Sequence, residues 1–218
     1  MGSGPLDDTR FVGYRRKLIE DIRARGIDDL ETLQYFDMVP RHTFLPEGVW
    51  PRAYEDAPIP IGFGQTISRP GVHALHLSLS DLDGSERVLE IGTGSGFQTA
   101  LLARLADTVF SIERVPELAD RAGRTLRELE IRNVTLTAGD GSGGWPEVAP
   151  FDVILIGAAA PEPPVHLYDQ LAADGRLLVP VGGAEAQELV RVANRDGSFH
   201  VETIDRARFV PLIGEHGW

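Results

Sequence analysis

The sequence contains no cysteine, which excludes disulfide bonds, catalytic thiolates and cysteine-ligated zinc. Lysine is almost absent as well, since Lys17 is the only one among 21 basic residues. The 33 acidic residues give the chain a net charge of −12, so its overall field repels nucleic-acid phosphate. We therefore expect neither thiol chemistry nor a nucleic-acid partner.

Long apolar runs are also missing. The longest, residues 153–161, falls short of the roughly 18 residues that a membrane helix needs. The opening MGSGPLDDTR lacks the basic and then apolar pattern of a signal peptide. We therefore expect no membrane association and a cytoplasmic protein. His73 and His76 stand three residues apart, but no third ligand accompanies them, so we expect no metal site.

The composition is that of a globular protein, and 218 residues suit a single domain. We divide this domain into N-terminal helices with a substrate cap (1–80) and an α/β core that binds the cofactor (81–218). Two helices are expected before Met38, the second beginning at Asp28 or Asp29. Six prolines between Pro40 and Pro70 predict an irregular but ordered segment, of the kind that often carries function.

After residue 85, short apolar strands alternate with helical patterns. The strands are expected at 87–91, 109–113, 134–138, 153–156 and 176–181, and the helices at 96–106, 116–130 and 163–173. This alternation predicts a Rossmann-like α/β fold, a parallel sheet with helices on both faces. Two further strands, 188–193 and 199–204, flank a hairpin signal at 194–197 and predict an antiparallel end. We expect the tail, residues 214–218, to be mobile.

Residues 90–96 read Glu-Ile-Gly-Thr-Gly-Ser-Gly and connect a predicted strand to a predicted helix. Ligands of open parallel sheets bind at this edge, outside the carboxyl ends of the strands. A dinucleotide fingerprint would have a third glycine where Phe97 stands, and a phosphate-binding loop would continue with Gly-Lys-Ser or Gly-Lys-Thr. Neither continuation is present, so a phosphate ligand is disfavoured.

Acidic residues follow three successive strands instead. Glu90 would repel a pyrophosphate but suits the ammonium and sulfonium groups of S-adenosylmethionine (AdoMet), whose product is S-adenosylhomocysteine (AdoHcy). Glu113 can accept both ribose hydroxyls, and Asp140 with Gly141 can bracket the adenine. The alternative is that each acid is only a solvated strand end or a helix cap. The expected cofactor-binding residues are Glu90, Gly92, Thr93, Gly94, Ser95, Glu113, Arg114, Asp140 and Gly141.

A second motif, residues 62–70, reads Gly-Phe-Gly-Gln-Thr-Ile-Ser-Arg-Pro. With Val39-Pro40-Arg41, Gly139-Asp140-Gly141 and residues 208–212, it makes the chain resemble the protein-L-isoaspartate O-methyltransferase family nearly from end to end. The resemblance implies a class I AdoMet-dependent methyltransferase sheet with a helical N-terminal cap. It further implies methylation of the α-carboxylate of L-isoaspartyl residues in damaged proteins or peptides, which is a repair reaction.

The resemblance also assigns roles to residues of the second motif. The catalytic serine of the family falls on Ser68, and Thr66 lies two residues away on an extended segment. The residues expected to bind substrate are Gln65, Ile67, Pro70, Val210 and Pro211. An alternative role for Thr66 and Ser68 is to cap a helix that begins near Pro70, and the two roles can coexist.

Three residues depart from the family pattern: Gly71 replaces an aromatic residue or histidine, His76 a methionine, and Gly157 a threonine. These positions lie close to the substrate motif, so they bear on peptide preference rather than on the reaction. Alternatives are a carboxyl methyltransferase for a dedicated biosynthetic peptide, a tRNA-base methyltransferase, which the acidic composition disfavours, or a protein that binds AdoMet without catalysis. We expect a monomer whose partners are isoaspartyl-containing proteins and peptides.

Overall fold

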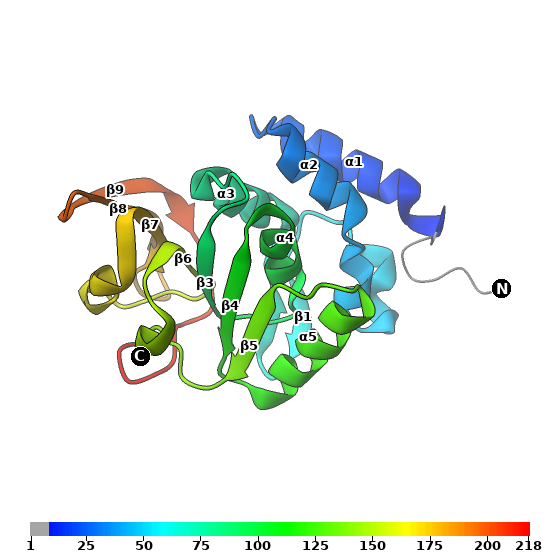
Figure 1. Ribbon diagram of the computed structural model, residues 1–218. Helices are drawn as coiled ribbons and strands as arrows, with labels where there is room; N and C mark the ends of the chain where they lie inside the picture. Colours follow the sequence, from blue (N-terminus) through cyan, green and yellow to red (C-terminus); the bar gives the residue numbers. More distant parts are fainter. Residues whose placement is uncertain (1–8) are drawn as a thin grey trace.

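The N-terminal region of this computed structural model, which describes residues 9–218, is helical (Figure 1). It comprises the 3-10 helix η2 (Thr9–Phe11) and the helices α1 (Val12–Arg23) and α2 (Leu30–Met38). The carboxylate of Asp29 accepts the backbone N–H of Thr32 at 2.8 Å and caps α2, as the sequence predicts. The prediction that residues 1–8 contain no signal peptide lies outside the described residues.

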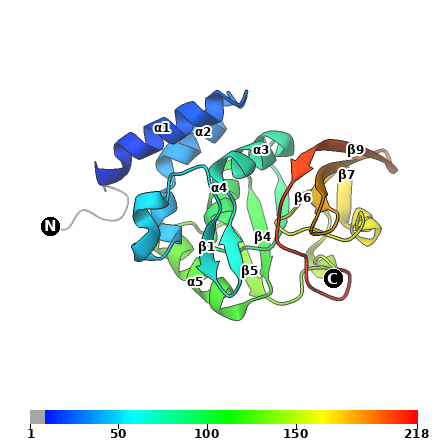
Figure 2. The same ribbon diagram turned by 180° about the vertical axis from the view of Figure 1, so that it is seen from behind.

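The proline-rich segment is ordered but more regular than expected. It contains two 3-10 helices, η3 (Arg41–Phe44) and η4 (Glu47–Arg52), followed by a hairpin of β1 (Ile59–Gly62) and β2 (Gln65–Ile67). Gly62, Phe63 and Gly64 all have positive φ at the hairpin turn, a conformation that glycine adopts without strain. Figure 2 shows β1 lying beside α5 (Pro116–Glu128), to which Arg121 joins it by a hydrogen bond to the Ile61 carbonyl at 2.5 Å.

A seven-stranded sheet forms the centre of the molecule. Its strands are β3 (Arg87–Ile91), β4 (Thr108–Glu113), β5 (Val134–Ala138), β6 (Phe151–Ile156), β7 (Leu171–Val181), β8 (Gln187–Arg195) and β9 (Ser198–Ala207). In space they run in the order β5-β4-β3-β6-β7-β8-β9. The first five of these are parallel, and β8 and β9 add the antiparallel hairpin that the sequence predicts.

The helices cover the sheet unevenly. Side chains from α3 (Pro70–Ser80), α4 (Phe97–Leu105) and α5 share one apolar cluster with one face of the strands. The opposite face packs on 3-10 helices and loops, η5 (Pro146–Val148) and η6 (Val165–Gln170) among them. The predicted helix at 163–173 is therefore wrong. The prediction that helices cover both faces of the sheet is wrong as well, because the second face carries 3-10 helices and loops. Pro164 disfavours a helical backbone at Pro163, and β7 already begins at Leu171, so only the short η6 fits between them.

The prediction of a mobile tail is also wrong. Residues 212–218, which we call the C-terminal strap, fold back over the end of the sheet (Figure 1). The backbone N–H of Glu215 donates to the Asp140 carboxylate at 2.7 Å, and the Trp218 indole donates to the Ala159 carbonyl at 3.0 Å. No helix within residues 9–218 combines the length and apolar character that crossing a membrane requires.

Candidate active site

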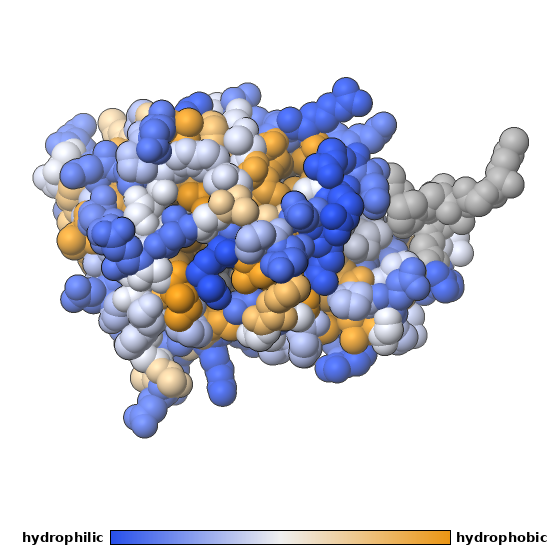
Figure 3. All heavy atoms as spheres, turned by 90° about the horizontal axis from the view of Figure 1, so that it is seen from below, coloured by the Kyte–Doolittle hydropathy of each residue, from blue (hydrophilic) through white to orange (hydrophobic). Residues whose placement is uncertain are grey.

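A pocket lies at the carboxyl ends of β3, β4 and β6, against the hairpin and the C-terminal strap. Figure 3 views the molecule from the end where β3 and β4 finish, and shows apolar surface exposed between strongly polar residues there. The lining residues are Gln65, Thr66, Ile91, Gly92, Gly94, Ile112, Glu113, Arg114, Gly141, Gly157, Ala158, Val210, Pro211, Leu212 and Ile213. The pocket thus combines segments that are more than 140 positions apart in the sequence.

The glycine turn after β3 forms one wall of the pocket. Gly92, Gly94 and Gly96 all have positive φ, so the chain can turn sharply between β3 and α4. A Cβ on Gly96 would lie 2.9 Å from the Cβ of Ala122 on α5, which explains why no side chain stands there. The turn therefore presents bare backbone to whatever occupies the pocket.

Glu113, at the end of β4, is buried and braces this turn. Its two carboxylate oxygens accept the backbone N–H groups of Gly94 at 2.7 Å and Val115 at 2.9 Å. Each carboxylate oxygen has two lone pairs, so both can accept a second hydrogen bond from the pocket side. The role of Glu113 as an acceptor for two ribose hydroxyls stays a prediction.

Glu90 lies deeper, at the end of β3, and is 1% exposed. One oxygen accepts the hydroxyls of Thr99 at 2.5 Å and Ser111 at 2.7 Å, whereas Oε1 is buried with no partner within the described residues. Burial raises the pKa of Glu90 to about 7, and repulsion from Glu113 adds to the rise. An unpartnered, buried carboxylate oxygen fits a cationic group such as the ammonium of AdoMet.

Asp140 has a different surrounding from the other two acids. Its carboxylate accepts the backbone N–H groups of Ser142 at 2.8 Å and Glu215 at 2.7 Å, so its hydrogen bonds go to its own loop and to the C-terminal strap. The adjacent Gly141 does line the pocket, and a Cβ there would lie 2.9 Å from Ile91 Cγ2. The backbone of Gly141 therefore packs directly against Ile91 and Ile112, where a side chain has no room.

The hairpin supplies the opposite side of the pocket. Gln65 and Thr66 line it, while Ser68 directly follows β2, lies outside the lining and is half-buried. No hydrogen bond of the Thr66 or Ser68 hydroxyl occurs within residues 9–218, and α3 begins with Arg69 as N-cap and no side-chain cap bond. The Gly71 N–H is satisfied by the Asp56 carboxylate at 2.8 Å. The alternative that Thr66 and Ser68 cap this helix is therefore wrong.

Val210 and Pro211 reach the pocket from the far end of the chain. The backbone N–H of Ala159 donates to the Val210 carbonyl, and that of Leu212 donates to the Ala159 carbonyl, both at 2.8 Å. This short parallel pairing continues from the end of β6. It brings the predicted substrate residues next to the glycine turn.

Several predicted residues do not line the pocket. Thr93 and Ser95 turn into the protein: the Thr93 hydroxyl lies 2.6 Å from that of Ser111, and the Ser95 hydroxyl accepts the Phe97 N–H at 3.3 Å. The other predicted residues outside the lining are Ile67, Ser68, Pro70, Glu90 and Asp140. Sequence reasoning missed Ile91, Ile112, Ala158, Leu212 and Ile213 as lining residues, and only their position at strand ends or beside Val210-Pro211 could have indicated them.

The three departures from the family pattern have local explanations. A side chain on Gly71 would press on Asp56, which pairs with Arg25, since its Cβ would lie 3.1 Å from Asp56 Oδ1. His76 is buried and stacks on Phe209 with ring centroids 5.6 Å apart, and burial lowers its pKa to about 4, so the ring is neutral. Gly157 lines the pocket, and a Cβ there would lie only 3.2 Å from the backbone carbonyl oxygen of Gly92.

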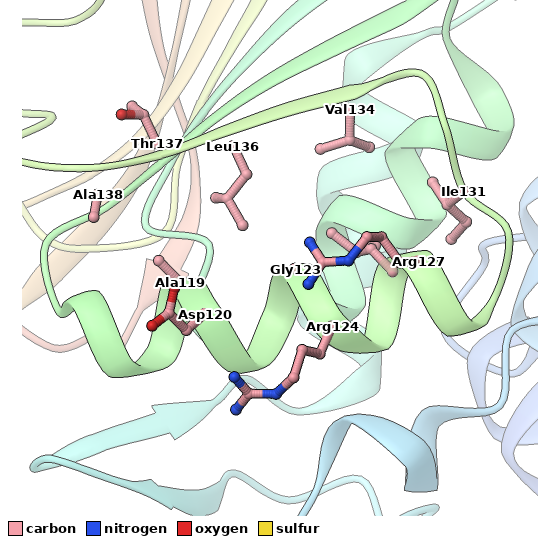
Figure 4. Close-up of a pocket in the computed structure, with 11 residues that line it drawn as sticks. Ala119, Asp120, Gly123, Arg124, Arg127, Ile131, Val134, Leu136, Thr137 and Ala138 are labelled. Carbon is pink, nitrogen blue, oxygen red and sulfur yellow. The ribbon is translucent and has the colours of Figure 1, made fainter.

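A second hollow lies between α5 and β5 and shares no lining residue with the first. Val134 and Leu136 project from β5 toward α5, and Arg124 points away from the strand (Figure 4). The hollow has neither a glycine turn nor a cluster of acids, so it lacks the features that suit AdoMet. Within residues 9–218, no group of three His, Asp or Glu side chains is arranged to hold a metal ion.

Comparisons with known proteins agree with one another. A family model described as protein-L-isoaspartate(D-aspartate) O-methyltransferase matches residues 14–217. A protein-L-isoaspartate O-methyltransferase of Syntrophus aciditrophicus (strain SB) is 48% identical over 213 residues, 96% of this chain and 98% of the relative. One of Methanoculleus marisnigri is 46% identical over 205 residues, 94% of this chain and 93% of the relative.

Solved structures give the same result. One named protein-L-isoaspartate O-methyltransferase superposes with a TM-score of 0.83 at 30% identity and covers 93% of this chain and 67% of that chain. A second, described as such an enzyme from Plasmodium falciparum in complex with AdoHcy, has a TM-score of 0.80 at 28% identity, covering 91% and 98%. Both similarities extend over almost the whole described chain.

Proposed function

Because the chain belongs to the protein-L-isoaspartate O-methyltransferase family, we propose that Thr66 and Ser68 hold the α-carboxylate of an isoaspartyl residue at the cofactor pocket. The reaction is AdoMet-dependent methylation of that carboxylate, which initiates repair of damaged proteins and peptides. A single observation carries the proposal: Thr66 and Gln65 line the same pocket as the glycine turn and Glu113.

The acceptor needs no general base. A peptide α-carboxyl has a pKa near 3.5, so it is already an anionic nucleophile at neutral pH. AdoMet, when bound, supplies a methyl group on a positively charged sulfur. The work of the protein is to aim the carboxylate and to exclude water, and such positioning contributes several kcal/mol.

Neutral hydroxyls suit this task better than a direct ion pair. Charge on the carboxylate is dispersed during methyl transfer, so a donor that binds the anion tightly stabilises the ground state and slows the step. The hydroxyls of Ser68 and Thr66 have no partner within the described residues and are thus available to the acceptor. The exposed Arg69 attracts the anion from farther away.

Other features of the enzyme remain predictions. We propose that residues 1–80 act as the substrate cap and 81–218 as the cofactor core of a single domain. We also propose that the enzyme is a cytoplasmic monomer that binds no nucleic acid.

The test is methyl transfer from labelled AdoMet to matched isoaspartyl and aspartyl peptides. We expect the isoaspartyl peptide to react at least about 100-fold faster, since a misplacement of 1 Å costs on that order. Ser68→Ala should lower kcat by about 10- to 1000-fold and leave AdoHcy affinity within about threefold. The control is Ser78→Ala, an exposed serine on α3 that should have no effect.

Two outcomes would contradict the proposal in different ways. Equal rates with both peptides would remove the repair substrate and favour a dedicated peptide acceptor, with Gly71 and His76 as the first residues to examine. Full turnover by Ser68→Ala on the isoaspartyl peptide would keep the substrate but transfer the role of Ser68 to Thr66.

A further inference from the structure

Arg41, at the start of η3, is the largest fully buried side chain in the described part of the molecule, with 0% exposure. Its Nε donates to the Ala53 carbonyl and its Nη2 to the Ser68 carbonyl, both at 2.8 Å. Its Nη1 lies 3.4 Å from Nδ1 of His73 on α3. Within residues 9–218 no carboxylate forms a salt bridge with this guanidinium.

A buried cation that forms no salt bridge destabilises a protein, and the attraction of Tyr54 and Asp56 to Arg41 through space opposes only part of the effect of burial. Burial lowers the pKa of Arg41 to about 9, so the group still carries its charge at neutral pH. The Phe97 ring, 4.8 Å from the guanidinium carbon, offsets part of the desolvation. An apolar side chain of similar length would fill this space without that cost, so packing alone does not account for an arginine here.

The hydrogen bonds of Arg41 converge on the acceptor side of the pocket. Ser68 stands in the short link between the end of β2 at Ile67 and the start of α3 at Pro70. Arg41 ties the carbonyl of this link to Ala53 and to α3 through His73. The backbone position of Ser68, and with it the direction of its hydroxyl, therefore depends on the guanidinium.

The charge has a consequence of its own. The donors of Arg41 are directed at carbonyls and at His73, while its positive charge lies immediately behind Ser68. Such a charge attracts an anion at Ser68 through space without forming a hydrogen bond to it. This arrangement favours binding of a carboxylate and leaves the oxygen lone pairs free to attack a methyl group.

We infer that Arg41 is a positioning residue for the methyl acceptor: it fixes Ser68 through its carbonyl and supplies a buried positive charge behind it. The inference rests on the proposed role of Ser68. It concerns a residue on η3 that does not line the pocket and that the reaction as described above does not use.

The first measurement is a double-mutant cycle with Ser68→Ala, using kcat/KM for an isoaspartyl peptide. Arg41→Met removes the positive charge and the hydrogen bonds to the Ala53 and Ser68 carbonyls. Arg41→Lys keeps a positive charge but lacks the planar guanidinium that donates to both carbonyls. We expect Arg41→Met to lower kcat/KM by about 30- to 300-fold and Arg41→Lys by less. In the Ser68→Ala background the loss on Arg41→Lys should shrink to under about threefold, because coupled residues are not additive.

The second measurement compares the binding affinities of two peptides in the presence of AdoHcy, which prevents turnover: the isoaspartyl substrate and its neutral α-carboxamide analogue. The wild-type enzyme should prefer the carboxylate by about 10- to 100-fold, and Arg41→Met should reduce that preference to under about threefold. The control is Arg52→Met, an exposed arginine on η4 paired with Glu55, which should leave the preference unchanged. AdoHcy affinity within about threefold of wild type establishes that each variant is folded.

The outcomes separate this inference from the proposed function. Additive losses in the cycle would overturn positioning through Ser68, and an unchanged carboxylate preference in Arg41→Met would overturn the electrostatic part. If Ser68→Ala alone behaves like wild type, the proposed role of Ser68 fails, and the inference drawn from it fails with it. If Arg41→Met does not bind AdoHcy, the coupling between Arg41→Lys and Ser68→Ala alone tests the positioning role, since the lysine variant keeps the buried charge.

Discussion

At the scale of single residues, Glu90 is the side chain whose state depends most on what the pocket contains. Its Oε1 is buried without a partner, and burial raises its pKa to about 7. In the folded protein without cofactor, protonation removes a buried charge. We predict that the ammonium of bound AdoMet or AdoHcy lies beside Oε1 and favours the ionised form instead. Glu90 thus links cofactor binding to pH.

The stability of the cofactor-free enzyme should therefore fall as pH rises. A folded-state pKa of about 7 lies above the ordinary value of 4.5, so the stabilisation is fully present below about 4.5 and lost as pH rises through 7. Glutamine cannot ionise, so the free energy of unfolding of Glu90→Gln should change with pH by about 1–3 kcal/mol less than that of wild type. Thermal unfolding of both proteins between about pH 5 and 8 measures the difference.

The control for this prediction is Glu117→Gln, an exposed residue on α5 that should leave the pH profile unchanged. AdoHcy should also raise the melting temperature of wild type more at pH 8 than it raises that of Glu90→Gln. Parallel pH profiles for wild type and Glu90→Gln would show that Glu90 does not titrate in this range.

The acids of the site were predictable from sequence to different degrees. Glu90 and Glu113 end strands of a parallel sheet, so their place at the carboxyl edge follows from the alternation of elements alone. Asp140 was expected for the same reason, but its oxygens accept hydrogen bonds from Ser142 and Glu215. A partner 75 residues away cannot be read from local pattern.

At the scale of elements, the C-terminal strap forms one side of the pocket. Leu212 and Ile213 line it, and beyond them the backbone N–H of His216 donates to the Ser142 hydroxyl at 3.0 Å. The strap thus lies across the loop that contains Gly141. A cofactor whose ring rests beside Gly141 leaves more slowly when this cover is closed.

Truncation after Ile213 should open that cover. We expect AdoHcy to dissociate about 3- to 30-fold faster from the truncated enzyme, with a smaller change in association, because lost contacts act mainly on dissociation. Stopped-flow release of AdoHcy measures the rate. His216→Ala is the control, since it removes the ring that stacks on His166 and keeps the backbone bonds of the strap. Equal dissociation rates for wild type and the truncated enzyme would contradict the prediction.

The sequence predicted well those elements that form around a local motif such as a turn sequence. The hairpin of β8 and β9 formed around Asn194–Gly197, where the Asn194 side chain accepts the Gly197 N–H at 2.9 Å. The tail, residues 214–218, was predicted to be mobile. Its order comes from tertiary hydrogen bonds to Asp140, Ser142 and Ala159, which no local propensity encodes.

At the scale of the whole molecule, the net charge of −12 acts on every substrate before it reaches the pocket. The acceptor is itself an anion, so the field of the enzyme opposes the approach of acidic peptides and favours basic ones. The local positive charge of Arg41 acts only at short range. Long-range steering and local recognition therefore have opposite signs.

Peptide charge should consequently alter kcat/KM in a salt-dependent way. At about 20 mM salt we expect an isoaspartyl peptide of net charge about +3 to react several-fold faster than one of about −3. The difference should vanish near about 500 mM salt, because the charges are then screened. The control compares isoaspartyl peptides that differ in sequence but have the same net charge. A ratio independent of salt would assign the preference to contacts at the site rather than to the field.

The position of Trp218 has a practical consequence for work with this enzyme. Its backbone N–H donates to the Leu212 carbonyl at 2.8 Å and its indole to Ala159, so the last residue lies on the same edge of the sheet as the pocket. An affinity tag, a fluorescent reporter or a surface linker attached there would emerge beside the entrance of the cofactor. Attachment at the exposed turn of Asp196 and Gly197, between β8 and β9, keeps such additions on a different element.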